Sequence, residues 1–157
     1  MMAAVDRSGV SVSLSDDGTI IAIGAEFNSG NGYYSGHVRV YSFDSTSWVQ
    51  IGDDIDGEAG NVKSSRSVSL SNDGTIIAIG AEGNDGNDTK SGHVRVYSFD
   101  TTSWVQIGDD IDGEATGDSS GGSVSLSYDG TTVAIGAAGN DGNGSSSGHV
   151  RVYSWAN

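Results

Sequence analysis

The seven residues SGHVRVY occupy positions 35–41, and the same seven letters return at 91–97 and 147–153. The chain's three histidines, His37, His93 and His149, are therefore spaced 56 residues apart. A fixed period of some tens of residues is the mark of a repeat architecture, in which each repeat is one supersecondary unit. The repeat therefore decides the fold.

Each repeat contains short runs that are typical of strands. The order is SVSLS, then TIIAIGA or TTVAIGA, then HVRVY, and in the first two repeats WVQIG. These runs alternate polar with apolar residues or are rich in β-branched and aromatic ones. Asp17-Gly18, Asp73-Gly74 and Asp129-Gly130 separate the first two runs and predict tight two-residue hairpins. Each repeat is therefore expected to form a four-stranded antiparallel meander.

Meanders that repeat at such a period are typical of β-propeller blades, and a parallel β-solenoid is the alternative. Solenoid coils are shorter and lack tight hairpins, which favours the propeller. We therefore predict an all-β β-propeller built from three near-identical blades in one repeat domain, 1–157. The first blade covers 11–66, the second 67–122, and the third, without its outer strand, 123–157.

Three blades are fewer than the four to eight of closed propellers. Bare sheet faces and edges promote association, so the protein's main expected partner is itself. A homodimer that forms a ring of six blades is the favoured arrangement. A trimer with nine blades and a head-to-tail filament are the alternatives, and a fragment of a longer propeller would also fit.

The composition excludes several classes of partner. The net charge is −14, with only seven lysines and arginines, so nucleic-acid binding is not expected. No apolar run reaches the length of a membrane span, and membrane insertion is not expected either. The absence of cysteine rules out disulfides and cysteine-bound zinc.

The stretch from SGVSVSLSDDGTIIAIGA to SGHVRVYSF resembles an FG-GAP repeat, the blade of integrin-α-type β-propellers. The resemblance extends over nearly the whole chain and implies an extracellular or cell-surface adhesion setting. The family's calcium loop lies in the first hairpin and ends with an acidic ligand on the second strand. Because Ile20, Ile76 and Thr132 stand at that position here, this calcium site is not carried over.

The repeated His and Arg residues are interpreted as structural, since a catalytic site is usually needed only once. We expect each imidazole to bond to a neighbouring blade and each arginine to pair with a carboxylate of the acidic GDDIDGE segments. These residues are His37, Arg39, His93, Arg95, His149 and Arg151.

The two GDDIDGE segments also hold carboxylates at alternate positions. They are either solvated connectors or weak calcium sites. The calcium candidates are Asp54, Asp56 and Glu58 with their equivalents Asp110, Asp112 and Glu114. No other cofactor is expected.

The loop after the second strand differs most between repeats, and loops that vary on a fixed scaffold are where recognition normally occurs. Solvent-exposed drift explains the variation equally well. The ligand candidates are Asn28, Asn31, Tyr33, Tyr34, Asn84, Asp85, Asn87, Asn140, Asp141 and Asn143.

These features predict a non-enzymatic β-propeller module for binding or assembly, with an adhesion-type or structural role. A lectin-like multivalent glycan binder is the first alternative, and a protein ligand is a further potential partner. A head-to-tail filament-forming structural protein is the second alternative. An enzyme is disfavoured, because no nucleophile–base pair is recognisable.

Overall fold

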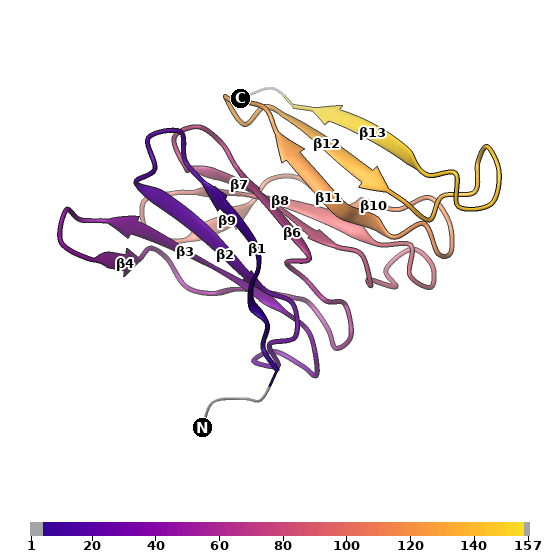
Figure 1. Cartoon of the computed structure of the whole chain (residues 1–157), viewed down its shortest axis with the longest axis horizontal. Coiled ribbons are helices and arrows are strands. Elements are labelled where there is room, and N and C mark those ends of the chain that lie inside the picture. The colour runs from indigo at the N-terminus through magenta and orange to yellow at the C-terminus, as the bar shows by residue number, and fades with distance from the viewer. Residues whose placement is uncertain (1–4, 156–157) are drawn as a thin grey trace.

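The computed structural model describes residues 5–155. Every regular element in this range is a β-strand, and the strands form three antiparallel sheets (Figure 1). Within the described range no helix is long and apolar enough to cross a membrane.

The three sheets repeat one strand order along the chain. Sheet 1 contains β1 (Ser8–Leu14), β2 (Ile20–Ala25), β3 (His37–Phe43), β4 (Trp48–Gln50) and β5 (Ile55–Asp56). Sheet 2 contains β6 (Ser67–Leu70), β7 (Ile76–Ala81), β8 (His93–Phe99), β9 (Trp104–Gln106) and β10 (Ile111–Asp112). Sheet 3 contains β11 (Ser120–Leu126), β12 (Thr132–Ala137) and β13 (His149–Ser154).

The first strands of sheets 1 and 3 begin three residues before the predicted starts of their blades. Gly9 and Gly121 allow this, because their φ angles of +91° and +86° are accessible to glycine at little cost. They form bulges, after which pairing continues beyond the predicted start, with Ser8 opposite Ala25 and Ser120 opposite Ala137.

The outer strand of sheets 1 and 2 is split in two, which the sequence analysis did not anticipate. β4 pairs with the end of β3, and β5 pairs with its beginning, where Ile55 lies opposite Val38 and Asp56 opposite His37. Ile55 is buried in the core, so its hydrophobic side chain holds this part of the acidic segment on the sheet. The segment is therefore partly a strand and not only a solvated connector.

The first hairpin of each repeat has a four-residue loop, and the prediction of a two-residue turn is wrong. Ser15 N donates to Ile20 O, and Gly18 N donates to Ser15 O across a turn in which Gly18 has a φ of +71°. Asp17 Oδ1 accepts hydrogen bonds from Ser15 Oγ and from the Thr19 backbone and hydroxyl. Aspartate thus closes the loop through its side chain, which needs no left-handed conformation at that residue. The other two repeats form the same turn.

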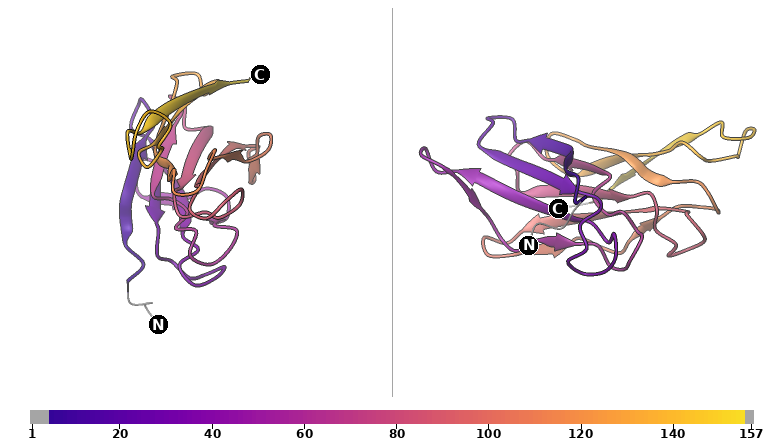
Figure 2. Two further views of the ribbon diagram at one scale, coloured as in Figure 1. Left: turned by 90° about the vertical axis from the view of Figure 1, so that its right-hand side faces the viewer. Right: turned by 60° about the horizontal axis from the view of Figure 1, so that its bottom comes forward.

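The three sheets are stacked face to face in chain order, with sheet 2 between the other two (Figures 1 and 2). Their first strands lie side by side, β1 next to β6 and β6 next to β11. We call the face of a sheet that is turned toward the preceding sheet its leading face and the opposite one its trailing face. The contact between two consecutive sheets is called a joint.

Two hydrophobic clusters fill the two joints. At the joint of sheets 1 and 2, Val38 and Val40 on the trailing face meet Ile77 and Ile79 on the leading face, all at most 3% exposed. At the joint of sheets 2 and 3, Val94 and Val96 meet Val133 and Ile135 in the same way. Burial of apolar side chains between sheets is thus the main force that holds the stack together.

Candidate functional site

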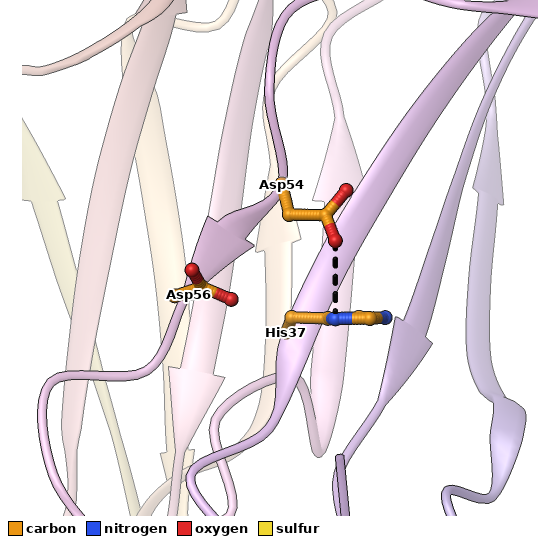
Figure 3. Close-up of side chains that lie close together, drawn as sticks. All are labelled: His37, Asp54 and Asp56. Atoms are coloured by element: carbon orange, nitrogen blue, oxygen red, sulfur yellow. Dashed lines mark ion pairs between the residues drawn. The ribbon is translucent and has the colours of Figure 1, made fainter. Parts of the chain in front are cut away.

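The first repeated histidine lies against the outer strand of its own sheet (Figure 3). His37 Nδ1 is 3.5 Å from Asp54 Oδ2, and Asp54 accepts three hydrogen bonds of 2.8–3.0 Å from the Arg39 guanidinium. Burial, and then the charge of Arg39, lower the pKa of His37, while the hydrogen bond from Arg39 lowers the pKa of Asp54. His37 therefore takes its carboxylate partner from its own sheet, and not from a neighbouring blade as the sequence analysis expected.

His93 occupies the same position in sheet 2 and is more deeply buried. Its Nδ1 lies 3.5 Å from Asp110 Oδ2, also in its own sheet, and its side chain is 2% exposed. Burial, and then the charge of Arg95, lower the pKa of His93 to about 4. In sheet 3, where the described residues include no outer strand, His149 Nδ1 instead lies 3.9 Å from Glu114 of the preceding segment.

The arginines of sheets 2 and 3 reach back across the joints. Arg95 Nη1 lies 3.4 Å from Glu58 Oε1, and Arg95 Nη2 donates to Asp56 O at 3.3 Å. Arg151 contacts Glu114 at 3.1 Å and donates to Asp112 O. Both arginines therefore link a sheet to the one before it, whereas Arg39 bonds within sheet 1.

The carboxylates considered for calcium are divided between different groups. Asp54 and Asp56 lie with His37, whereas Glu58 lies with His93 and Asp110, the ligand atoms of each group being within 4.8 Å of one another. A third group joins Glu114 and Asp118 to His149, and Asp112 belongs to none of the three. Ca²⁺ takes six to eight oxygen ligands, and Arg39 already occupies both oxygens of Asp54. The predicted sets of Asp54, Asp56 and Glu58 and of Asp110, Asp112 and Glu114 are therefore not assembled into calcium sites.

The low pKa of His93 predicts a pH dependence of stability. Between pH 6.5 and about 4 the unfolded chain binds a proton at this residue that the folded state does not, so the free energy of unfolding falls as the pH is lowered through this window. In urea denaturation, His93→Gln is expected to show a shallower decrease from pH 7 to pH 5 than the wild type. Equal slopes would show that His93 is not buried in its neutral form.

Most of the polar loop residues considered as ligand contacts bond within the chain. Asn28 Oδ1 accepts a hydrogen bond from Gly30 N at 2.8 Å, and Asn84 and Asn140 make the same turn. The Nδ2 atoms of Asn31 and Asn87 donate to Gly57 O and Gly113 O. Asp85 and Asp141 accept from the backbone of their own loops, while Asn143 is exposed. These structural contacts are a sufficient reason for asparagine to recur at these loop positions, and ligand binding is not needed to explain it.

The loop of sheet 1 has an aromatic cluster. Tyr34 stacks on Tyr33, with ring centroids 3.9 Å apart, and on Phe27 at 4.8 Å. The Arg7 guanidinium lies over the Phe27 ring at 4.3 Å. Tyr33 is 64% exposed and is the part of this cluster that is available for contact with a ligand.

The two tryptophans of the outer strands lie in different surroundings. Trp104 Nε1 donates to Ile51 O at 3.1 Å across the joint, and its indole lies against Gly52. Trp48 has no preceding sheet within residues 5–155 and is 46% exposed. Trp104 thus packs against the adjacent sheet, whereas the equivalent side of Trp48 is exposed to solvent.

The outward faces of sheets 1 and 3 are strongly hydrophobic. On the leading face of sheet 1, Val12 and Leu14 are 60% and 56% exposed, whereas their equivalents Val68 and Leu70 are buried. Ile21, Ile23, Tyr41 and Trp48 line a hollow of about 320 Å³ on this face.

The trailing face of sheet 3 is exposed in the same way. Val150 and Val152 are 67% and 65% exposed, whereas the equivalent Val94 and Val96 are buried inside the stack. Beside Val150, a hollow of about 600 Å³ is lined by Ser123, Gly136 and Gly148, among others. We call the two outward surfaces the leading end face and the trailing end face, and together they are the strongest candidate functional site.

Comparison with known proteins supports the fold and gives no family. No protein-family model matches the chain, and no curated protein does. Among solved structures, the complex of KlAtg21 with the coiled coil of AgAtg16 matches with a TM-score of 0.60 and 16% identity, over 92% of this chain and 39% of that chain. A protein assigned as a 6-phosphogluconolactonase from Bacteroides uniformis matches with a TM-score of 0.51 and 19% identity, over 86% and 38%.

These likenesses concern the fold alone. Since KlAtg21 is a β-propeller, the three sheets are arranged like propeller blades. The chain spans about two fifths of the length of each of these two structures.

The residues that make the joints were not recognisable from the sequence. Several are glycines and serines, such as Gly24 and Gly80, and Ser13 and Ser69, whose equivalents Gly136 and Ser125 recur in the third repeat without a following sheet. Their recurrence was the available signal, but in a chain so rich in glycine and serine it did not distinguish joint residues from turn residues.

Proposed function

We propose that the chain is a non-enzymatic binding and assembly module that associates with itself through its two end faces. The observation that carries this proposal is the exposure of Val150 and Val152 at one end and of Val12 and Leu14 at the other. Their equivalents form the hydrophobic clusters between sheets inside the stack. Contiguous exposed hydrophobic surface of this kind marks an interaction site.

A ring of about six blades is the assembly that these faces favour. Two copies supply six of the described sheets, within the four to eight that closed propellers contain, whereas three copies supply nine. If successive copies rotate so that the ring does not close, the same head-to-tail contact produces a filament.

The absolute mass in solution tests this function. Light scattering after size exclusion is expected to give a species of twice the 16.0 kDa chain mass. A series of larger species whose mass increases with protein concentration would support the filament, in which the same contact forms but the ring does not close. If the protein stays monomeric even at the highest concentration that can be prepared, the proposed self-association is wrong.

Glycan binding is a second candidate function, favoured by the exposed, stacked Tyr33. Aromatic faces are common platforms for apolar and CH-rich ligands. Wild-type protein is expected to bind members of a glycan array if this function holds, and Tyr33→Ala to lose that binding. Asn143 is exposed in the loop of sheet 3, which lacks the aromatic cluster, so Asn143→Ala serves as the control and should leave binding unchanged.

A further inference from the structure

We infer that the trailing end face of one copy and the leading end face of a second copy form a third joint, built in the same way as the two joints inside the chain. This inference rests on the proposed self-association and specifies its partner surfaces and polarity. It predicts a contact between two different faces, and not between two identical ones.

Serine hydrogen bonds cross both internal joints. Ser11 Oγ donates to Ser65 O at 2.6 Å, and Ser67 Oγ donates to Gly121 O at 2.8 Å. Ser123 is the third member of this series. The corresponding acceptor on a following sheet is Gly9 O of a second copy.

In a second set of polar contacts the following sheet donates and the preceding sheet accepts. Leu70 N donates to Ser13 Oγ at 3.0 Å, and Leu126 N donates to Ser69 Oγ at 2.9 Å. The unused members of the series are Ser125 Oγ on the trailing end face and Leu14 N on the leading end face. The two end faces therefore carry one acceptor and one donor that match each other.

At both internal joints the backbone of the following segment comes very close to a recurring glycine. A Cβ on Gly36 would lie 2.1 Å from the carbonyl oxygen of Ser64, in the segment that leads into β6, and a Cβ on Gly92 would lie 2.1 Å from that of Ser120 in β11. At Gly148 the nearest atom is 3.4 Å away and belongs to the same sheet. The hollow of about 600 Å³ lies at this place. At the internal joints, the corresponding space is filled by the segment that leads into the first strand of the following sheet.

The charged residues of the joint between sheets 1 and 2 have uncharged or already paired equivalents on the two end faces. At the joint of sheets 1 and 2, Arg66 contacts Glu82 at 3.2 Å and Glu26 at 3.9 Å. On the trailing end face, Ala138 stands at the position of Glu26. On the leading end face, Val10 stands at the position of Arg66. Glu26, at the position of Glu82 on that face, is paired with Arg7 at 3.2 Å. Joining the two end faces therefore places an alanine near a valine and buries no unpaired charge there, which would be costly.

Two charge substitutions test the polarity of the joint. Val152→Asp disables the trailing end face and Leu14→Asp the leading end face. Both positions are more than half exposed in the single chain, so both variants are expected to fold with unchanged circular dichroism. Each variant alone is expected to lose self-association by at least about 100-fold, because the new charge would be buried without a partner. Val49→Asp, at an exposed valine outside both end faces, is the matched control and should associate like the wild type.

Mixing the two variants is the decisive measurement. A mixture keeps one intact pair of faces, so a one-to-one complex is expected by light scattering at a concentration where each variant alone is monomeric. If one variant still associates with itself, or if mixing restores nothing, the third joint is wrong although self-association stands. A monomeric wild type would instead overturn the proposed function.

Discussion

Gly92→Ala is expected to lower the free energy of unfolding by about 2–5 kcal/mol. Gly92 has a φ of +74°, where an alanine costs about 1–2 kcal/mol. Its Cβ would also lie 2.1 Å from Ser120 O, so sheet 3 must move away from sheet 2, and overpacking of this kind costs about 1–3 kcal/mol more. Urea denaturation of the Val152→Asp variant, with and without the change, measures the effect on a single chain.

Gly148→Ala is the matched control for this prediction. Gly148 has nearly the same φ, +69°, but no atom lies closer than 3.4 Å to the added Cβ. In the Val152→Asp background it is expected to show only the backbone cost of about 1–2 kcal/mol. Equal losses for the two alanines would contradict a close contact between sheets at Gly92.

Ile77→Ala is expected to destabilise the chain by about 2–5 kcal/mol, the range for a fully buried aliphatic side chain. Ile77 is 0% exposed in the cluster between sheets 1 and 2. Removing its side chain leaves a cavity that both sheets line, and neither sheet can close the cavity alone. The loss is measured by urea denaturation, again in the Val152→Asp background.

The equivalent residue on the leading end face is the comparison for this second prediction. Ile21 is only partly buried, because no sheet packs against it within residues 5–155. Ile21→Ala is therefore expected to cost about 1 kcal/mol in the monomeric background, but to weaken association when introduced into the wild type. A loss as large as that of Ile77→Ala in the monomer would show that the leading end face is already covered.

Local sequence patterns were sufficient to predict the inner strands of each sheet. Alternation and β-branched residues placed the cores of β2, β3, β7 and β8, because burial of one face leaves a direct record in the sequence. The split outer strand was missed, since Gly52–Asp54 reads as a connector while Ile55 is held on the sheet by packing on residues far away in the chain. The four-residue hairpin was missed because Asp17 acts through its side chain, and not through a left-handed backbone.

The candidate site was harder to predict for a related reason. Polar residues such as Asn28 and Asp85 were the predicted ligand contacts, but their side chains bond within their own turns. The end faces carry ordinary core residues, such as Val12 and Val152, which differ from Val68 and Val96 only in having no sheet beside them. A sequence pattern identifies core residues but does not say which copies of a repeated core remain uncovered.

Hydrogen exchange of the two end faces tests the central claim most directly. Leu14 N on the leading end face is expected to become protected as the protein is concentrated, because its equivalent Leu70 N bonds across a joint. Tyr128 N on the trailing end face should become protected at the same concentration, since Asn72 N, its equivalent, bonds to the following sheet. Simultaneous protection of both amides, absent from the Val152→Asp variant, is the predicted result. Protection of only one of them, or of neither, would contradict a joint between the two end faces.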